Sequence, residues 1–245
     1  MTAEADSRGN KCAQCAVCPY EWAERYCRKE HGRAPDNCPS LRHGDLVGQA
    51  THELQSSHIL EFACQASIQE AEGYGDRHLG YGAVRPIKPR ILEIMEFAKR
   101  MKYRRLALIF CVGLRREAKA VHEIFEQHGF EVISVVCKVG SVPKDMLGLS
   151  EDQKIVPHTF ESMCNPILQA LIANHYESEF NVLLGLCVGH DSLFFRYGKA
   201  PCTVLAVKDR LLGHNPLAAI YHYDGYYRYL KSPSTLIPEF TKKTK

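Results

Sequence analysis

The sequence predicts an α/β fold with a small cysteine-rich module in front of it, and three observations support this. After residue 104, short β-branched runs alternate with amphipathic segments, which is the pattern of a mainly parallel sheet with helices on both faces. Residues 45–103 carry apolar residues at helical spacing and are predicted to pack on that core. Residues 1–44 hold five cysteines and little apolar periodicity, so this segment needs a metal to fold. We therefore predict three domains: 1–44, 45–103 and 104–245.

The helical segment is predicted to contain two helices. The first, within "DLVGQATHELQSSHILEFACQASIQEAEGYG", stops at Gly73 and Gly75. The second, "KPRILEIMEFAKRMKY", ends in a cluster of Lys and Arg that suits the negative end of a helix dipole.

The α/β domain is predicted to be an open, Rossmann-like sheet of about four strands. The predicted strands are 106–111, 131–137, 182–187 and 203–207. The predicted helices are 114–128, 166–176, 192–197 and 216 to about 229. Asn165 and Pro166 are suited to the cap and first turn of the second of these helices.

Composition excludes several classes of protein. The chain has 245 residues, of which 45% are apolar and 24% charged, as in an ordinary soluble globular protein. The net charge of +3 gives no basic field for nucleic acid, and no apolar run reaches the ~20 residues that cross a membrane. The start "MTAEADSRGNK" lacks the apolar stretch of a secretion signal, which predicts a cytoplasmic protein. Because the cytosol is reducing, the eleven cysteines point to metal, redox chemistry or core packing rather than disulfides.

Three of the four predicted strands end in a cysteine that a glycine soon follows: Cys111, Cys137 and Cys187. In open parallel sheets, ligands bind beyond the carboxyl ends of the strands. Cys164 precedes a predicted helix N-terminus, where the helix dipole favours a thiolate. We therefore predict that these four thiols bind a cofactor at one edge of the sheet.

Thiolates in this number suit zinc or an iron–sulfur cluster, such as a four-iron, four-sulfur (4Fe–4S) centre. The alternative is that the cysteines pack as small hydrophobic residues. His190 is a candidate proton donor or ligand, and Asp191 a candidate orienting carboxylate or helix cap. Cys111 is a fourth ligand or a nucleophile, so the predicted catalytic residues are His190, Asp191 and Cys111. Charged residues after the fourth strand either hold an anionic substrate or form a solvated loop: Lys208, Asp209 and Arg210.

The amino-terminal cysteines have the spacing of a metal site. Cys12 and Cys15 form a C-x2-C pair, and Cys27 and Cys38 supply two more thiols, which together make a tetrahedral set. We predict zinc ahead of an iron–sulfur cluster, with Cys18 as the spare thiol.

Several motifs together resemble an uncharacterised family of cysteine-rich metal-binding proteins, found mainly in anaerobic bacteria and archaea. They are "KCAQC", "CRKEHGRAPDNCP", "FCVGLRREAK", "CKVG", "ESMCNPILQA", "GLCVGHDSLFFRYGKAP" and "VKDRLLGHNP". The resemblance spans nearly the whole chain and implies a metal. By motif, it assigns one site to Cys12, Cys15, Cys27 and Cys38, and the other to Cys111, Cys137, Cys164 and Cys187. Cys18 and the insertion "PYEWAERY" depart from the pattern and leave the choice between Cys12 and Cys18 open.

The sequence thus predicts a cytoplasmic protein with two metal sites that reduces, desulfurises or rearranges a small molecule, or that meets a redox partner protein. The alternatives are a non-catalytic carrier or sensor of metal or electrons, and an interaction module with structural zinc only. The sequence does not identify the substrate or the oligomeric state.

Overall fold

The computed structural model describes residues 12–232 of the chain. The chain divides into two compact units, Met1–Ile68 and Gln69–Lys245, with the division inside helix α3 (Ser57–Glu72). No helix in the described range is long and apolar enough to cross a membrane.

The first unit is built from short helices and loops. It contains two 3-10 turns, η1 (Cys15–Val17) and η2 (Trp22–Glu24), and helices α1 (Pro39–Arg42), α2 (Gly44–Leu54) and the start of α3. The sequence predicted one helix where α2 and α3 lie. The helix is interrupted at Gln55 and Ser56, whose N–H groups bond three residues back, to the carbonyls of His52 and Glu53. Between residues 12 and 68 no residue is buried, so this unit has no hydrophobic core of its own.

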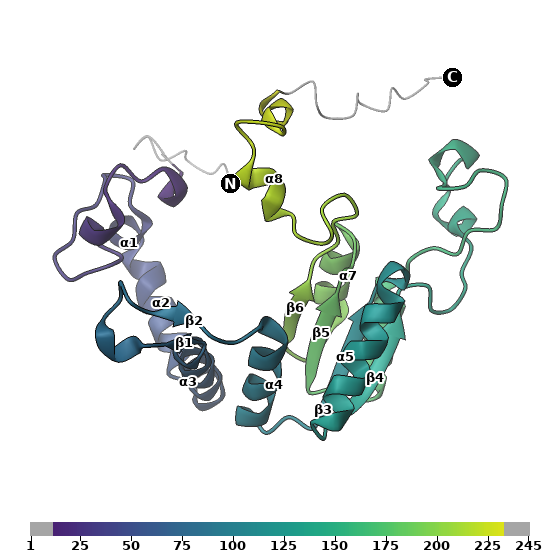
Figure 1. Ribbon diagram of the computed structural model, residues 1–245, viewed down its shortest axis with the longest axis horizontal. Helices are drawn as coiled ribbons and strands as arrows, with labels where there is room; N and C mark the ends of the chain where they lie inside the picture. Colours follow the sequence, from purple (N-terminus) through teal and green to yellow (C-terminus); the bar gives the residue numbers. More distant parts are fainter. Residues whose placement is uncertain (1–11, 233–245) are drawn as a thin grey trace, which may run out of the picture. The chain divides into compact units, whose positions relative to one another are not determined.

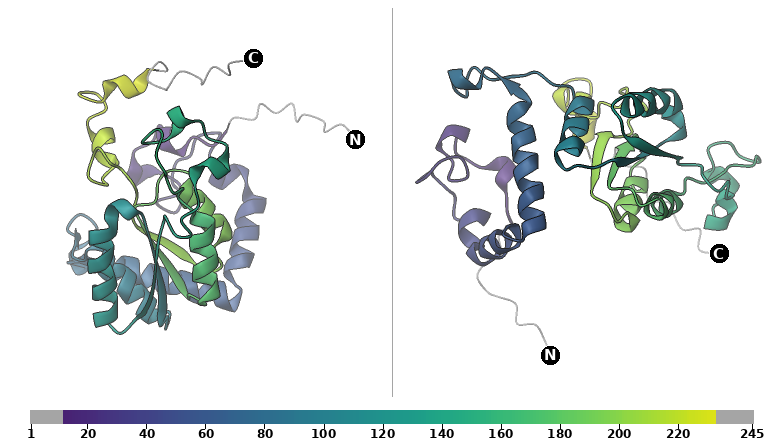
Figure 2. Two further views of the ribbon diagram at one scale, coloured as in Figure 1. Left: turned by 90° about the vertical axis from the view of Figure 1, so that its right-hand side faces the viewer. Right: turned by 90° about the horizontal axis from the view of Figure 1, so that it is seen from below.

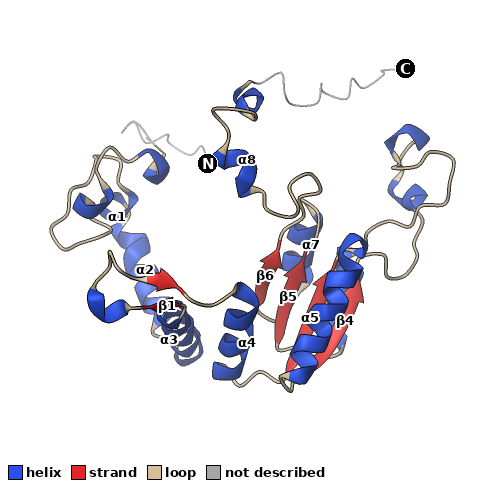
Figure 3. Ribbon diagram, viewed as in Figure 1, coloured by secondary structure: helices blue, strands red, loops and turns tan. Residues whose placement is uncertain are grey.

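The second unit contains the predicted parallel sheet (Figures 1 and 3). Its strands are β3 (Arg105–Phe110), β4 (Glu131–Val136), β5 (Phe180–Leu184) and β6 (Cys202–Ala206), in the order β4-β3-β5-β6 and all parallel. The predicted α/β fold is therefore confirmed. Phe110 pairs with both Val136 and Leu184, so the three strands β3, β4 and β5 end at one level.

Helices cover both faces of this sheet (Figures 1 and 2). The helices α4 (Arg90–Arg100) and α5 (Arg115–Gln127) lie on one face, and α6 (Pro166–His175) and α7 (His190–Tyr197) lie on the other. A two-stranded antiparallel hairpin, β1 (Tyr74–Gly75) and β2 (Arg85–Pro86), precedes α4.

The apolar residues of the sheet alternate between these two helical layers. Ala107 and Ile109 of β3 belong to one buried cluster with Ala170 of α6 and Phe194 of α7. Because side chains alternate along a strand, Leu106 and Leu108 point to the opposite face, and both are fully buried. Cys111 and Cys137 belong to the cluster on the α6 and α7 side, which places both thiols on that face.

The last predicted helix is shorter than expected. Helix α8 spans only Leu217–Tyr221, and turns lead from it to the 3-10 turn η7 (Arg228–Lys231). The predicted helix to about residue 229 was wrong, because Asp224 and Gly225 favour a turn and the surrounding tyrosines are poor helix formers.

Candidate thiol site

Three of the predicted cysteines meet at the carboxyl edge of the sheet. Cys111 follows β3 and Cys137 follows β4, and the two side chains are hydrogen-bonded. Cys164 lies just before α6, with its Sγ 3.7 Å from Sγ of Cys137. We call Cys111, Cys137 and Cys164 the thiol row, with Cys137 in the middle.

Backbone hydrogen bonds fix the row in place. The Cys137 N–H donates to the carbonyl of Phe110 at 2.8 Å, and the Asn165 N–H donates to the carbonyl of Cys137 at 2.7 Å. The Asn165 side chain accepts from the Leu168 N–H at 3.0 Å, which confirms the predicted cap of α6. Cys164 is thus held beside Cys137 at the positive end of a helix, where a thiolate is stabilised.

The environment of Cys164 strongly favours its thiolate. Its pKa is lowered to about 4, chiefly because the Cys137 thiol hydrogen-bonds to it, and next because His190 does. Burial opposes this shift, while the charges of Lys138 and His190 support it. The pKa of His190 is raised in turn, mainly by its hydrogen bond to Cys164, so each of the two groups favours the charged form of the other.

The other two thiols of the row have pKa values shifted in opposite directions, upward for Cys137 and downward for Cys111. The pKa of Cys137 is raised because its proton is held by Cys111 and Cys164 and because the thiol is buried. The pKa of Cys111 is lowered by the same contact with Cys137, by the Gly113 N–H and by Lys208. A single Cys137 proton cannot serve both neighbours at once. Cys164 gains a further bond from His190, and Cys111 gains bonds from the Gly113 N–H and Lys208, so both outer thiols favour the thiolate. Only Cys164 has a neighbour, His190, that readily donates a proton near neutral pH.

Gly113 allows Lys208 to approach the row. A methyl group on Gly113 would lie 3.3 Å from Nζ of Lys208 and 3.9 Å from Sγ of Cys111. A side chain at this position would therefore crowd the ammonium group away from the sulfur. The "CVG" motif after β3 supplies the thiol and also this space.

The structure places His190 and Asp191 in different roles. His190 is the first residue of α7 and bonds to Cys164. Asp191 accepts hydrogen bonds from the N–H groups of Gly189 at 3.1 Å and Ser192 at 2.8 Å, and thereby fixes the turn that starts α7. Of the two interpretations of Asp191, these bonds favour the structural one.

Cys187 lies on the loop after β5. Its sulfur accepts a hydrogen bond from Nη2 of Arg210 at 3.0 Å. Among residues 12–232, no three His, Cys, Asp or Glu side chains are placed so that they could hold one metal ion. A metal at this edge, held by Cys111, Cys137, Cys164 and Cys187, therefore stays a prediction.

Two residues of the site were not predicted. Lys138 donates to the carbonyl of Ser162 and its charge acts on Cys164. Gln169 of α6 is fully buried and donates to the carbonyls of Phe110 at 3.3 Å and Val135 at 2.8 Å, which ties the helix to the strand ends. The available signals were the lysine in "CKVG" and a single glutamine within the apolar run "PILQALIA".

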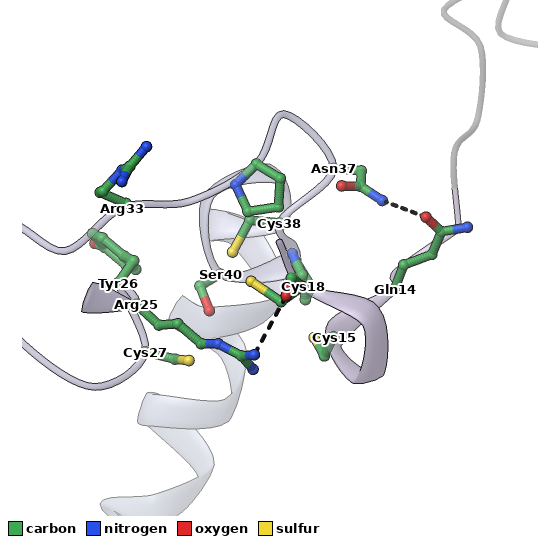
Figure 4. A pocket seen from close by; sticks show the side chains of 12 residues that line it. Gln14, Cys15, Cys18, Arg25, Tyr26, Cys27, Arg33, Asn37, Cys38 and Ser40 are labelled. Carbon is green, nitrogen blue, oxygen red and sulfur yellow. Dashed lines mark hydrogen bonds between the residues drawn. The ribbon is translucent and has the colours of Figure 1, made fainter. Parts of the chain in front are cut away.

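Four amino-terminal cysteines line a second, small pocket in the first unit (Figure 4). The pocket has a volume of about 60 Å³, and Figure 4 shows that it is lined by Cys15, Cys18, Cys27 and Cys38. Cys12 is exposed and does not line it, although its carbonyl accepts from the Asn37 side chain at 3.3 Å. Arg25 also lines the pocket and donates to the carbonyls of Tyr20 at 2.8 Å and Cys18 at 3.4 Å.

Comparison with known proteins gives one family. The model described as "Protein of unknown function (DUF1847)" matches residues 38–205. The chain belongs to the DUF1847 family. "Uncharacterized protein MJ0455" of Methanocaldococcus jannaschii is 48% identical over 134 residues, which cover 55% of this chain and 67% of that protein. No solved structure matches.

The DUF1847 match contains the whole thiol row and His190, and begins at Cys38. It confirms the predicted membership of an uncharacterised family. Neither the description of the family nor the name of the archaeal relative mentions a metal or an activity.

Proposed function

We propose that this DUF1847 protein is a thiol-dependent redox protein whose thiol row reduces a small disulfide-type substrate. The observation that carries the proposal is the row itself: Sγ of Cys137 lies 3.7 Å from Sγ of Cys164, and His190 hydrogen-bonds to Cys164 and favours its thiolate. This arrangement combines a nucleophile, a second thiol and a proton donor within hydrogen-bonding reach.

The reaction balances with the groups present. The Cys164 thiolate attacks one sulfur of a disulfide RSSR, forms a mixed disulfide and releases RS⁻, which takes the proton of the His190 imidazolium. Cys137 then attacks Sγ of Cys164, its proton passing through Cys111 to the second leaving RS⁻. The products are two RSH molecules and a Cys137–Cys164 disulfide. Two electrons have moved from the protein to the substrate.

Closing the disulfide requires a modest movement. The two sulfur atoms are 3.7 Å apart and must approach by about 1.7 Å to reach bonding distance. Cys164 is half-buried and precedes the helix, so rotation of its side chain can supply this movement. An external dithiol must return the two electrons for turnover, and the partner is therefore a small dithiol or a dithiol protein.

We further propose that a metal ion folds the first unit. The chemistry of the donor set suits zinc, because four thiols line one small pocket and zinc prefers tetrahedral sulfur ligands. Since no three of these side chains are placed to hold an ion as they stand, the thiols would have to close around it. Cys15, Cys18, Cys27 and Cys38 would hold the ion, with Cys18 in the place that spacing assigned to Cys12. A bound ion would replace the hydrophobic core that residues 12–68 lack.

The pH dependence of alkylation tests the thiolate. Because the Cys164 thiol is protonated only as the pH falls through about 4, its rate with iodoacetamide should be constant from about pH 5.5 to 8 and fall only below about pH 5. An ordinary thiol of pKa about 8.5 instead reacts about tenfold faster for each added pH unit in this range. Site-resolved mass spectrometry measures both profiles, with Cys64, exposed on α3, as the reference in the same molecule.

The test is the shape of the curve of alkylation rate against pH, not the absolute rate. A thiolate of such low pKa is a weaker nucleophile than that of an ordinary thiol by about a hundredfold, so its absolute rate is not diagnostic. A Cys164 rate that rises steadily to pH 8.5 would contradict the proposed nucleophile. In His190→Gln, which removes the cation, the midpoint should move upward.

A metal centre at the sheet edge is the second candidate, either for catalysis or in a carrier or sensor. The 3.7 Å between the sulfur atoms of Cys137 and Cys164 favours it, because two thiolates on one tetrahedral zinc lie about 3.8 Å apart. Metal analysis and the visible spectrum of anaerobically purified Cys27→Ser/Cys38→Ser protein separate the candidates. Metal that remains in this variant and disappears with Cys137→Ser would support the metal centre and overturn the thiol mechanism.

A further inference from the structure

Three positively charged side chains lie at the carboxyl edge of the sheet: Lys138 acts on Cys164, Lys208 on Cys111, and Arg210 contacts Cys187. Lys138 follows Cys137, and Lys208 and Arg210 lie on the loop after β6. Within residues 12–232, the side-chain hydrogen bonds of these three cations go to sulfur and carbonyl atoms rather than to carboxylates. Lys138 donates to a carbonyl, Lys208 to Cys111, and Arg210 to the sulfur of Cys187 at 3.0 Å.

The carboxylates near these cations are already engaged. Asp209 accepts from two backbone N–H groups of its own turn at 3.0 and 2.8 Å. Asp191 likewise accepts from the backbone N–H groups of Gly189 and Ser192 at the start of α7. Glu161 forms its ion pair with Lys144 at 2.5 Å. The positive charge at this edge is therefore only partly offset, and a half-buried site focuses the resulting field.

The loop that carries two of the cations has a defined shape. The Asp209 N–H donates to Nδ1 of His214 at 3.1 Å, and the His214 N–H returns a bond to the Asp209 carbonyl at 2.9 Å. The Lys208 N–H donates to the carbonyl of Leu186 at 3.3 Å, which aligns the loop with the end of β5. Lys208 and Arg210 are thus presented from a fixed turn at the same edge as Cys111 and Cys187.

We propose that Lys138, Lys208 and Arg210 select an anionic sulfur compound, in which a carboxylate or oxyanion lies close to the sulfur that Cys164 attacks. This inference rests on the proposed thiol chemistry and names its substrate class. A guanidinium pairs well with carboxylates and oxyanions, and the cations also stabilise the negative charge that grows on the leaving sulfur.

Disulfides of different charge test this selection on the full-length protein. The probes are dithiodiglycolate, which is anionic, 2-hydroxyethyl disulfide, which is neutral, and cystamine, which is cationic. For each disulfide, the rate of mixed-disulfide formation at Cys164 is divided by the rate at which the same disulfide reacts with 2-mercaptoethanol. This division corrects for differences in the intrinsic reactivity of the three disulfides. At low ionic strength we expect the anion to react about tenfold faster than the neutral probe, and the cation about tenfold slower. Added salt of about 0.5 M should shrink both differences.

Two variants separate local recognition from net charge. Arg210→Met should lower the ratio of the anionic to the neutral rate several-fold. Lys199→Met removes the same charge near the opposite edge of the sheet, just before β6, and should leave the ratio unchanged.

Thiosulfate tests an inorganic anion as the substrate. Attack by Cys164 on its outer sulfur forms a Cys164 persulfide and releases sulfite, which is measured directly. Sulfite release faster than reaction with dithiodiglycolate identifies an oxyanion rather than a carboxylate as the preferred group.

The outcomes distinguish the two proposals. Equal normalised rates for all three disulfides, unchanged in Arg210→Met, would overturn anion selection and leave the thiol chemistry standing. If no probe forms an adduct on Cys164, the proposed function fails and this inference fails with it.

Discussion

Replacing Cys164 by serine is expected to lower the rate of mixed-disulfide formation by at least about a thousandfold, because an alcohol has almost no ionised form at neutral pH. The rate is followed by release of the leaving thiol, and the adduct is located by mass spectrometry. The effect should be the largest of any single change in the second unit. Every other group of the site acts on the charge or the proton of this sulfur.

The neighbouring thiols should give different defects. Cys137→Ser should keep the first step but accumulate the mixed disulfide, since no second thiol remains to resolve it. Cys111→Ser should likewise keep the first step and slow the second, because Cys111 accepts the proton of Cys137. Cys64→Ser is the matched control, as this thiol is exposed on α3 in the other unit, and its rates should equal those of the unmodified protein.

The sequence instead predicted Cys111 as a fourth ligand or a nucleophile, and the same variants decide which of Cys111 and Cys164 attacks. Abolition of the first step in Cys111→Ser, with its retention in Cys164→Ser, would overturn the assignment made from the structure. The two cysteines differ in their cations: Lys208 faces Cys111, whereas His190 bonds to Cys164. Only the imidazolium can also donate a proton readily at neutral pH.

The fold and the thiol row could be predicted because they follow from local patterns. Buried parallel strands have continuous apolar runs, and the carboxyl ends of such strands meet at one edge. Cys111 and Cys137 end neighbouring strands, so their proximity follows from the parallel register of β3 and β4. Cys164 could be placed because Asn165 and Pro166 indicate where α6 begins.

Cys187 follows a strand whose end was predicted wrongly, and its place in the predicted site stays a prediction. The predicted strand ran to residue 187, but β5 ends at Leu184. Gly185 has a φ of +68°, which stops the strand and starts a loop. A methyl group on Gly185 would lie 2.0 Å from Cδ1 of Leu114, so the chain passes too close to this side chain for another residue type. Cys187 therefore lies beyond the sheet edge, beside Arg210.

The contacts of Lys138, His190 and Lys208 could not be predicted from the sequence. Each depends on how a loop directs a long side chain, and spacing along the chain carries no such information.

Spacing also fails to identify which amino-terminal cysteines line the pocket. The C-x2-C pattern is satisfied equally by Cys12 with Cys15 and by Cys15 with Cys18, and only the folded pocket favours the second pair.

Removing the metal that we propose for the first unit should unfold that unit alone. Between residues 12 and 68 no side chain is buried, so metal–thiolate bonds would take the place of hydrophobic contacts. Treatment of the full-length protein with a strong chelator should make residues 12–68 sensitive to limited proteolysis and reduce the helical circular dichroism signal. The sheet of the second unit has its own buried core and should stay resistant.

Single substitutions test which thiols hold the ion. Cys18→Ser should weaken zinc binding by more than about a hundredfold. Even groups that only hydrogen-bond to a metal ligand contribute about 10–100-fold to metal affinity, and the loss of a ligand itself should cost more. Cys12→Ser is the matched control, because it makes the same chemical change two residues before the first pocket-lining residue, Gln14, and it should bind zinc normally. Loss of zinc in Cys12→Ser with retention in Cys18→Ser would restore the ligand set expected from the spacing. Zinc binding unaffected by either change, or by Cys38→Ser, would mean that the pocket is not a metal site and that the first unit is held together by other contacts.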